Sequence, residues 1–291
     1  MEINDQLKDR IQHVANLPTL PQIASRMLRI INDPLTSSSD VAFVIGQDLS
    51  LSAKVLRLAN SAFYGVPRSI TNINSAVVIL GLKVLHTIVL GLTVFDMFPE
   101  NKKSADLFNR KSFWLHSLSC GLIAKFLASR IRKFIFFDPE EAFCAGLLHD
   151  IGKVVMEQYF HEDFHRALLT AQKKNISMFE AENETLGYNH THVAQWLTAS
   201  WGLPAELQLP LIYHHTPSDS NQFQDIIALC HLSDCLCYDF GMNNEKYISP
   251  EINTDAIQIL KLDQKDIDDL KDNFQLEMEK MKIFFDIAHN V

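Results

Sequence analysis

The residues AGLLHDIGKVVMEQYF, at positions 145–160, place His149 directly beside Asp150 inside an otherwise apolar run with helical spacing. Adjacent residues on a regular helix point about 100° apart, so two adjacent ligands converge poorly on one ion. Such a pair works better at a frayed helix end or between two ions, and Gly152 weakens the helix just beyond it. The pair is therefore interpreted as metal ligands, as catalytic groups, or as an accident of composition.

The rest of the chain also has helical patterning, and no convincing strand alternation appears, so we predict an all-α fold. One helix is expected from Pro21, and another after Ser37, followed by residues 49–63 with Ser50 or Ser52 as the N-cap. Residues 73–98 are expected to form two short helices or one kinked helix, with the break at Gly81. Further helices are expected over residues 103–133, 138–160, 176–187, 189–202, 204–215 and 224–241.

Bulk composition excludes several classes of protein. A net charge of -9 argues against sequence-independent binding to nucleic acid, which needs basic surface, but allows a small phosphorylated ligand at one local site. No apolar run reaches the roughly 18 residues that span a bilayer, so no membrane contact and a cytoplasmic location are expected. The five cysteines include no CxxC pair, which argues against a disulfide framework or a structural zinc site.

Histidines and acidic residues recur in an order that is more informative than any one of them. A single histidine on a helical segment is more often a hydrogen-bonded core residue than a ligand. Here, however, each candidate falls in or at the end of a separate expected helix, which is how helical bundles build metal sites. Mixed imidazole and carboxylate ligands suit iron, manganese, zinc or nickel. The candidate ligands are His116, His149, Asp150, His190, His214, His215 and Asp234.

This order resembles the HD superfamily of metal-dependent phosphohydrolases, in which HDIGK is the usual central motif. The segments LPTLPQIASRMLRIINDP, LSLSAKVLRLANSAFYG and ITNINSAVVILGLKVL resemble the HDOD (HD-related output domain) signature. The resemblance covers roughly residues 10–240 and implies an HD-like helical bundle with an N-terminal helical HDOD half. It also implies a regulatory role in bacterial signalling.

By the same resemblance, the site would hold two divalent ions, with iron or manganese expected and zinc or nickel as alternatives. The first ion would be held by His116, His149, Asp150 and Asp234. The second would be held by Asp150, His190, His214 and His215. Asp150 would act as a bridging catalytic carboxylate and Lys153 as a catalytic cation that approaches a phosphate. No GYP segment lies between Asp150 and His190, so hydrolysis of cyclic dinucleotides is not implied.

Several alternatives stay open from the sequence. His192 competes with His190 for the ligand role, and Asp225 and Asp239 compete with Asp234. His231, one turn before Asp234, is a candidate partner of a ligand. Residues 59–65 (ANSAFYG) could form a ligand loop, although packing at a helix end is favoured.

Three segments are expected: an N-terminal helical half (1–105), a metal-binding helical half (106–245) and an acidic amphipathic tail (246–291). The tail could dock on the core, on a partner or on a second copy, giving a homodimer. The favoured function is a regulatory module that binds signalling proteins. The alternatives are an active metal-dependent phosphohydrolase acting on a nucleotide or another phosphoester, and an all-α domain whose histidines bind no metal.

Overall fold

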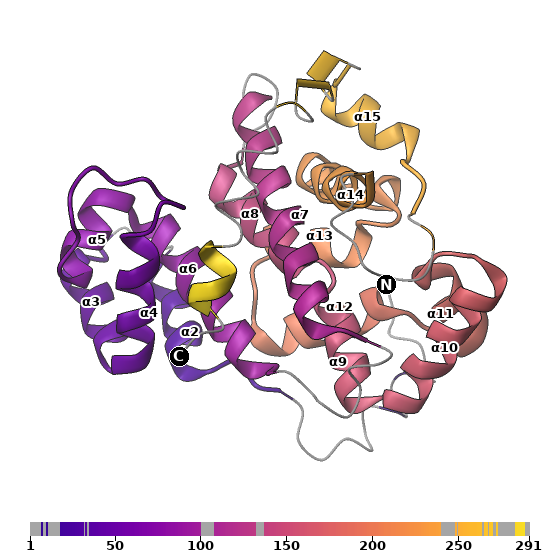
Figure 1. Ribbon diagram of the computed structural model, residues 1–291, viewed down its shortest axis with the longest axis horizontal. Coiled ribbons are helices and arrows are strands. Elements are labelled where there is room, and N and C mark those ends of the chain that lie inside the picture. Colours follow the sequence, from indigo (N-terminus) through magenta and orange to yellow (C-terminus); the bar gives the residue numbers. More distant parts are fainter. Residues whose placement is uncertain are drawn as a thin grey trace. The chain divides into compact units, whose positions relative to one another are not determined.

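The computed structural model shows helices and, in the residues that it describes, no strand (Figure 1). The all-α prediction is therefore confirmed. The described residues are 7, 10, 18–31, 33, 35–99, 108–131, 137–239, 248, 250–263, 265–266, 268–269, 272 and 283–288. The chain divides into two compact units, one formed by Met1–Pro18 with Glu100–Lys271 and the other by Thr19–Pro99 with Asp272–Val291. The expected segment boundary near residues 99–106 lies almost wholly outside the described residues.

In its described residues, the unit containing Thr19–Pro99 has five labelled helices. Asp48 caps α4 (Leu49–Ala59) by accepting a hydrogen bond from the Leu51 amide at 2.9 Å. The expectation of Ser50 or Ser52 as the N-cap of this helix is therefore wrong. Gly81 separates the last two with a φ of 93°, which a residue with a side chain rarely adopts. The helices are α2 (Gln22–Ile31), α3 (Ser38–Gly46), α4 (Leu49–Ala59), α5 (Ile73–Leu80) and α6 (Leu82–Met97).

The segment 59–65 lies at the end of α4. There the Asn60 side chain donates a hydrogen bond from Nδ2 to the Ile70 carbonyl and accepts one at Oδ1 from the Ile70 amide. Phe63 packs on Phe284 of the C-terminal residues 283–288, with ring centroids 5.2 Å apart. No single helix in the described part of the chain is long and apolar enough to cross a membrane. Within the same described residues, the pair α5 and α6 passes that test of length and composition together, but the two helices are bent by 119°.

The other unit holds the histidine-rich sequence. Its helices are α7 (Arg110–Arg130), α8 (Pro139–Leu148), α9 (Ile151–Tyr159), α10 (His161–Lys174), α11 (Met178–Leu186), α12 (His190–Trp201), α13 (Ala205–Tyr213), the 3-10 turn η1 (Pro217–Asp219), α14 (Gln224–Asp239) and α15 (Thr254–Leu260). Helix α15, in the expected tail, packs against α14, and its Ala256 and Leu260 are buried. The rest of that tail lies largely outside the described residues.

The opening stretch forms two helices rather than one. Helix α8 ends with His149 as its C-cap, and α9 begins after Asp150, whose φ of -98° and ψ of 13° leave the helical region. The break lies at the His-Asp pair itself, and Gly152 is inside α9. As a result, His149 and Asp150 are released from the 100° geometry of one regular helix.

Glycines set the distances between the helices that carry this pair. A Cβ on Gly152 would lie 1.9 Å from the carbonyl oxygen of His190, so only glycine permits α9 and the start of α12 to come this close. A Cβ on Gly146 of α8 would lie 2.8 Å from the carbonyl of Cys120 on α7. These two backbone contacts bring residues from α7, α8 and α12 together.

Candidate metal centre

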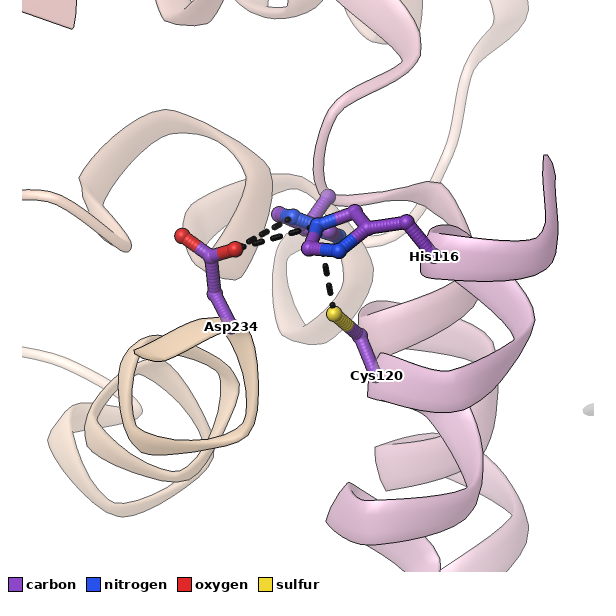
Figure 2. A group of neighbouring side chains, drawn as sticks. His116, Cys120 and Asp234 are labelled. Atoms are coloured by element: carbon purple, nitrogen blue, oxygen red, sulfur yellow. Dashed lines mark hydrogen bonds and ion pairs between the residues drawn. The ribbon is translucent and has the colours of Figure 1, made fainter. Parts of the chain in front are cut away.

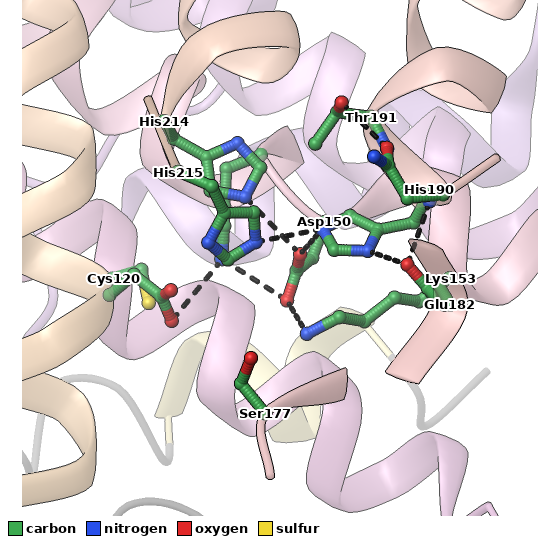
Figure 3. Close-up of polar contacts among 12 residues, drawn as sticks. Cys120, Asp150, Lys153, Ser177, Glu182, His190, Thr191, His214 and His215 are labelled. Atoms are coloured by element: carbon green, nitrogen blue, oxygen red, sulfur yellow. Dashed lines mark hydrogen bonds and ion pairs between the residues drawn. The ribbon is translucent and has the colours of Figure 1, made fainter. Parts of the chain in front are cut away.

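The structure brings all seven predicted ligands into two adjoining groups (Figures 2 and 3). In each group, the available ligand atoms lie within 4.8 Å of one another. The first group is His116, Cys120, His149 and Asp234; the second is Asp150, His190, His214 and His215. The residues come from α7, α12 and α14 and from the ends of α8, α9 and α13.

Asp150 lies between the two groups and turns one carboxylate oxygen toward each. Its Oδ2 lies 3.2 Å from His149 Nε2 and 3.9 Å from His116 Nε2. Its Oδ1 lies 3.2 Å from His190 Nε2 and 3.6 Å from His214 Nε2. The carboxylate is therefore oriented as one that bridges two ions would be.

Buried polar atoms without hydrogen bonds face the centre of both groups. They are Nε2 of His149 and of His214, and Oδ1 of Asp150 and of Asp234, none of which has a hydrogen bond of acceptable geometry to any described residue. Leaving such atoms unsatisfied costs about 1–3 kcal/mol each. A cation would satisfy them together, and nitrogen and carboxylate oxygen are suitable donors for a transition metal. The residues present thus fit a metal centre.

In three of the imidazoles, a hydrogen bond at Nδ1 fixes the ring so that Nε2 faces the centre of its ligand group. His149 Nδ1 donates to the Gly146 carbonyl at 2.8 Å, and His214 Nδ1 pairs with the Pro210 carbonyl at 3.2 Å. His190 Nδ1 lies 2.6 Å from Glu182 Oε2, which also accepts from the His190 amide at 2.9 Å. Such outer partners set the tautomer and orientation of metal-binding histidines.

In the second group, His190 Nε2 and His215 Nε2 are 3.0 Å apart. Two nitrogens held at right angles on one ion, with bonds of about 2.1 Å, would be separated by about 3 Å. The His215 ring also stacks on Phe179, with centroids 4.3 Å apart. The pair can therefore share one ion without rearrangement.

Charges within the centre oppose the effect of burial on the pKa values. Burial alone would lower the pKa of His149, but the carboxylates of Asp150 and Asp234 raise it to about 9. Burial would raise the pKa of Asp150, but His149 and Lys153 hold it well below its usual range. For His214, burial dominates and lowers the pKa to about 4. Asp150 is therefore held as a carboxylate and His214 as a neutral ring, the forms that bind metal.

Lys153 approaches the bridging carboxylate, with Nζ 2.6 Å from Asp150 Oδ2 and 3% exposure. It occupies one side of the oxygen that faces the first group. In this position it compensates the charge of Asp150, and its approach to a phosphate stays a prediction.

Two residues of the site, Cys120 and Glu182, are not among those predicted from the sequence. Cys120 lies four residues after His116 on α7, a spacing that places both side chains on one face of a helix and could have indicated it. Glu182 is completely buried on α11, eight residues before the histidine that it contacts. No local spacing connects that glutamate to the site.

The rival residues lie elsewhere. His192 accepts a hydrogen bond from the Asn189 amide at 3.2 Å as part of the capping box of α12. Asp225 and Asp239 are in neither group, whereas Asp234 Oδ1 lies 3.1 Å from His116 Nε2. His231, expected as a partner of a ligand, does contact one: its Nδ1 donates to the backbone carbonyl of His214 at 2.7 Å, and its Nε2 accepts from the Asn253 amide at 2.8 Å.

Access to the centre is narrow. Six of the seven predicted ligands have an exposure of no more than 2%. Only His215 is half-buried, and it lies beside the half-buried Phe179. Among the described residues, the edge formed by these two rings is therefore the most exposed part of the two ligand groups.

The fold and the paired groups define an all-α protein of the HD type with a candidate metal centre. The chain belongs to the HDOD domain family, whose domain matches residues 17–217. It resembles an HDOD domain protein of unknown function from Geobacter sulfurreducens, with 25% identity, a TM-score of 0.81 and coverage of 96% of this chain and 97% of that one.

Other similar structures agree on the fold. A candidate signal transduction protein from Marinobacter aquaeolei VT8 has 23% identity and a TM-score of 0.80. The match covers 98% of this chain and 65% of the Marinobacter chain. A candidate phosphohydrolase from Shewanella amazonensis SB2B has 24% identity and a TM-score of 0.73, and the match covers 96% of this chain and 97% of the Shewanella chain.

In sequence, an uncharacterized protein of Treponema pallidum (strain Nichols) is 24% identical over 233 residues, which is 78% of this chain but only 44% of that protein.

Proposed function

We propose that this chain is a regulatory domain of bacterial signal transduction that acts through a partner protein and contains a dinuclear metal centre in its helical core. The observation that carries the proposal is the burial of a complete ligand set, with six of the seven side chains at no more than 2% exposure. A centre this enclosed joins six helices but offers a substrate little access. Its ions serve to hold those helices together.

The proposed ligand sets are the two that the resemblance implies. His116, His149 and Asp234 hold one ion, and His190, His214 and His215 hold the other, with Asp150 shared between them. Iron or manganese is the expected metal, with zinc or nickel as alternatives. When bound, such a pair of ions supplies a water of lowered pKa and neutralises phosphoryl charge.

Exposed apolar side chains support a protein partner. Phe43 and Leu49 are 64% and 85% exposed, and Val78 is 77% exposed. They belong to α3, α4 and α5, which pack against one another in the unit containing Thr19–Pro99. Exposed apolar side chains on helices that contact one another are candidates for a surface that binds a protein.

An active phosphohydrolase is the second candidate, favoured by the half-buried edge at His215 and by Lys153 beside the bridging carboxylate. The similar Shewanella protein bears a phosphohydrolase name, which supports the same alternative.

The deciding experiment measures metal content and hydrolysis separately. The full chain, purified without chelators, is analysed for metals and assayed on bis(p-nitrophenyl) phosphate, nucleotides and cyclic dinucleotides. The regulatory proposal expects about two ions per chain and no hydrolysis that depends on Asp150 or His215. The control is His165→Ala, in the same unit but outside both groups. Enzyme-like turnover that is lost in Asp150→Asn and kept in His165→Ala would establish the hydrolase instead.

A further inference from the structure

The first ligand group contains a thiol beside its histidines. Cys120 Sγ lies 3.5 Å from His116 Nε2, and the residue is completely buried (Figure 2). A sulfur and a nitrogen on one tetrahedral ion, with bonds of about 2.3 and about 2.05 Å, would be about 3.6 Å apart. The observed separation therefore suits two ligands of a single ion.

The other members of the group are placed for the same ion. Asp234 Oδ1 lies 3.1 Å from His116 Nε2 and 3.6 Å from His149 Nε2. Both Asp234 Oδ1 and His149 Nε2 are buried without a hydrogen bond of acceptable geometry to any described residue. Three buried donor atoms thus converge on the space beside the sulfur.

The backbone fixes the thiol in this place. Cys120 is four residues after His116, so α7 presents both side chains on one face. Gly146 of α8 brings its backbone against that of Cys120, and the same Gly146 carbonyl accepts the hydrogen bond from His149 Nδ1 at 2.8 Å. One close contact therefore sets the position of Cys120 relative to His149.

A second thiol lies behind the first. Cys237 Sγ of α14 is 3.3 Å from Cys120 Sγ and is also completely buried. It is outside the four-residue ligand group, and its sulfur accepts a hydrogen bond from the Cys120 thiol. When a metal displaces the Cys120 proton, the Cys237 thiol can donate to the Cys120 sulfur instead. Hydrogen bonds to a coordinated sulfur are a common way to orient and tune it.

We infer that Cys120 is a thiolate ligand of the first metal position, with Cys237 as its hydrogen-bond partner, so that this position selects zinc, cobalt or ferrous iron over manganese and magnesium. Thiolate favours these softer ions, whereas the second group offers only imidazole and carboxylate. The two positions are consequently unequal in metal preference. This inference rests on the proposed metal centre and adds a ligand and a selectivity to it.

Spectroscopy of the cobalt-loaded full chain tests the inference without an activity assay. Freed of metal and titrated with Co²⁺, the wild type should show a sulfur-to-cobalt charge-transfer band in the near ultraviolet. Cys120→Ser should lose this band while keeping the visible cobalt bands. Cys144→Ser, a buried thiol outside both groups, is the matched control and should keep both. Zinc affinity should fall about tenfold or more in Cys120→Ser, with manganese affinity nearly unchanged.

X-ray absorption of the zinc-loaded wild type gives a second readout that needs no variant, because a thiolate ligand appears as a sulfur scatterer at about 2.3 Å. Bound zinc without that scatterer, or cobalt without the charge-transfer band, would overturn the role of Cys120 and leave the metal centre standing. A band lost in Cys237→Ser but kept in Cys120→Ser would also overturn it, in favour of Cys237. Failure to bind any metal would overturn both the inference and the proposed function.

Discussion

The two compact units differ sharply in the polar groups that they bury. In the described part of Thr19–Pro99, the buried polar side chains are those of Lys54, His86, Thr87 and Thr93. Lys54 pairs with Asp96, whose side chain is 54% exposed, so even this charge lies near solvent. Apolar packing therefore accounts for most of the stability of that unit.

The unit containing Glu100–Lys271 instead buries histidines, carboxylates and a lysine around Asp150. A buried charge destabilises a protein unless it is paired and hydrogen-bonded, and several ligand atoms here are not. The difference is that the polar groups buried in one unit are few, whereas those buried in the other converge on a candidate metal centre. Changes in metal and pH should consequently act on the two units unequally.

Removal of the shared carboxylate should have the largest effect. Asp150→Asn keeps the shape of the side chain but removes the charge that faces both groups, so affinity for both ions should fall by about 1,000-fold, or about 4 kcal/mol. Calorimetric titration with Zn²⁺ or Mn²⁺ measures this change. Asp96→Asn, in the other unit, is the control and should bind metal as the wild type does. Unchanged binding in Asp150→Asn would show that the carboxylate is not a ligand.

Substitution of Gly152 should come next. Because an added Cβ would lie 1.9 Å from the His190 carbonyl oxygen, Gly152→Ala must displace the start of α12. We expect a loss of about 3 kcal/mol in the free energy of unfolding, with weaker binding of the ion held by His190. The matched control is Gly46→Ala in α3, where the new methyl would meet nothing within 4 Å and should be neutral or mildly stabilising. Chemical denaturation compares them, and equal effects would contradict the close contact.

Much of this arrangement could be predicted from sequence because it depends on local patterns. The break at Gly81 follows from its conformational freedom, and the buried faces of α7, α8 and α14 follow from apolar spacing. The separate helices that carry His116, His190 and Asp234 could be recognised in the same way. That these side chains bind metal stays a prediction, although the structure does bring them together.

Features set by contacts between distant helices could not be predicted. The contact of Glu182 with His190 depends on how the turn between α11 and α12 folds back. The division of the opening stretch into α8 and α9 depends on the close approach of α9 to α12 at Gly152. Helix α10 is absent from the expected helices, although Phe164, Ala167, Leu168 and Ala171 have helical spacing and are buried.

The pH dependence of the metal-free chain should change sign when metal is added. The pKa of His149 is raised from 6.5 to about 9, so its proton stabilises the folded state fully below pH 6.5 and this contribution is lost as pH rises through 9. Without metal, unfolding free energy should fall by about 2 kcal/mol between about pH 6.5 and about pH 8.5. With saturating metal, the unfolding free energy should instead rise over this pH range, because fewer protons compete with the metal for the ligands as the pH increases. Thermal unfolding with and without chelator measures both trends, and parallel curves would count against metal binding at His149.

The smallest effect concerns His86, on α6 of the largely apolar unit. Burial lowers its pKa from 6.5 to about 4, and Nε2 has no hydrogen bond to any described residue. Below pH 6.5, His86 is protonated in the unfolded chain but stays neutral in the folded chain. The free energy of unfolding should therefore fall by about 1.5 kcal/mol between about pH 6.5 and about pH 5. His86→Leu should remove this loss. Hydrogen exchange of the α6 amides localises the effect to this unit, independently of the histidines around Asp150. If the α6 amides of the wild type and of His86→Leu were equally sensitive to acid, His86 would already be protonated in the folded chain. The two units would then differ less in buried charge than their buried side chains indicate.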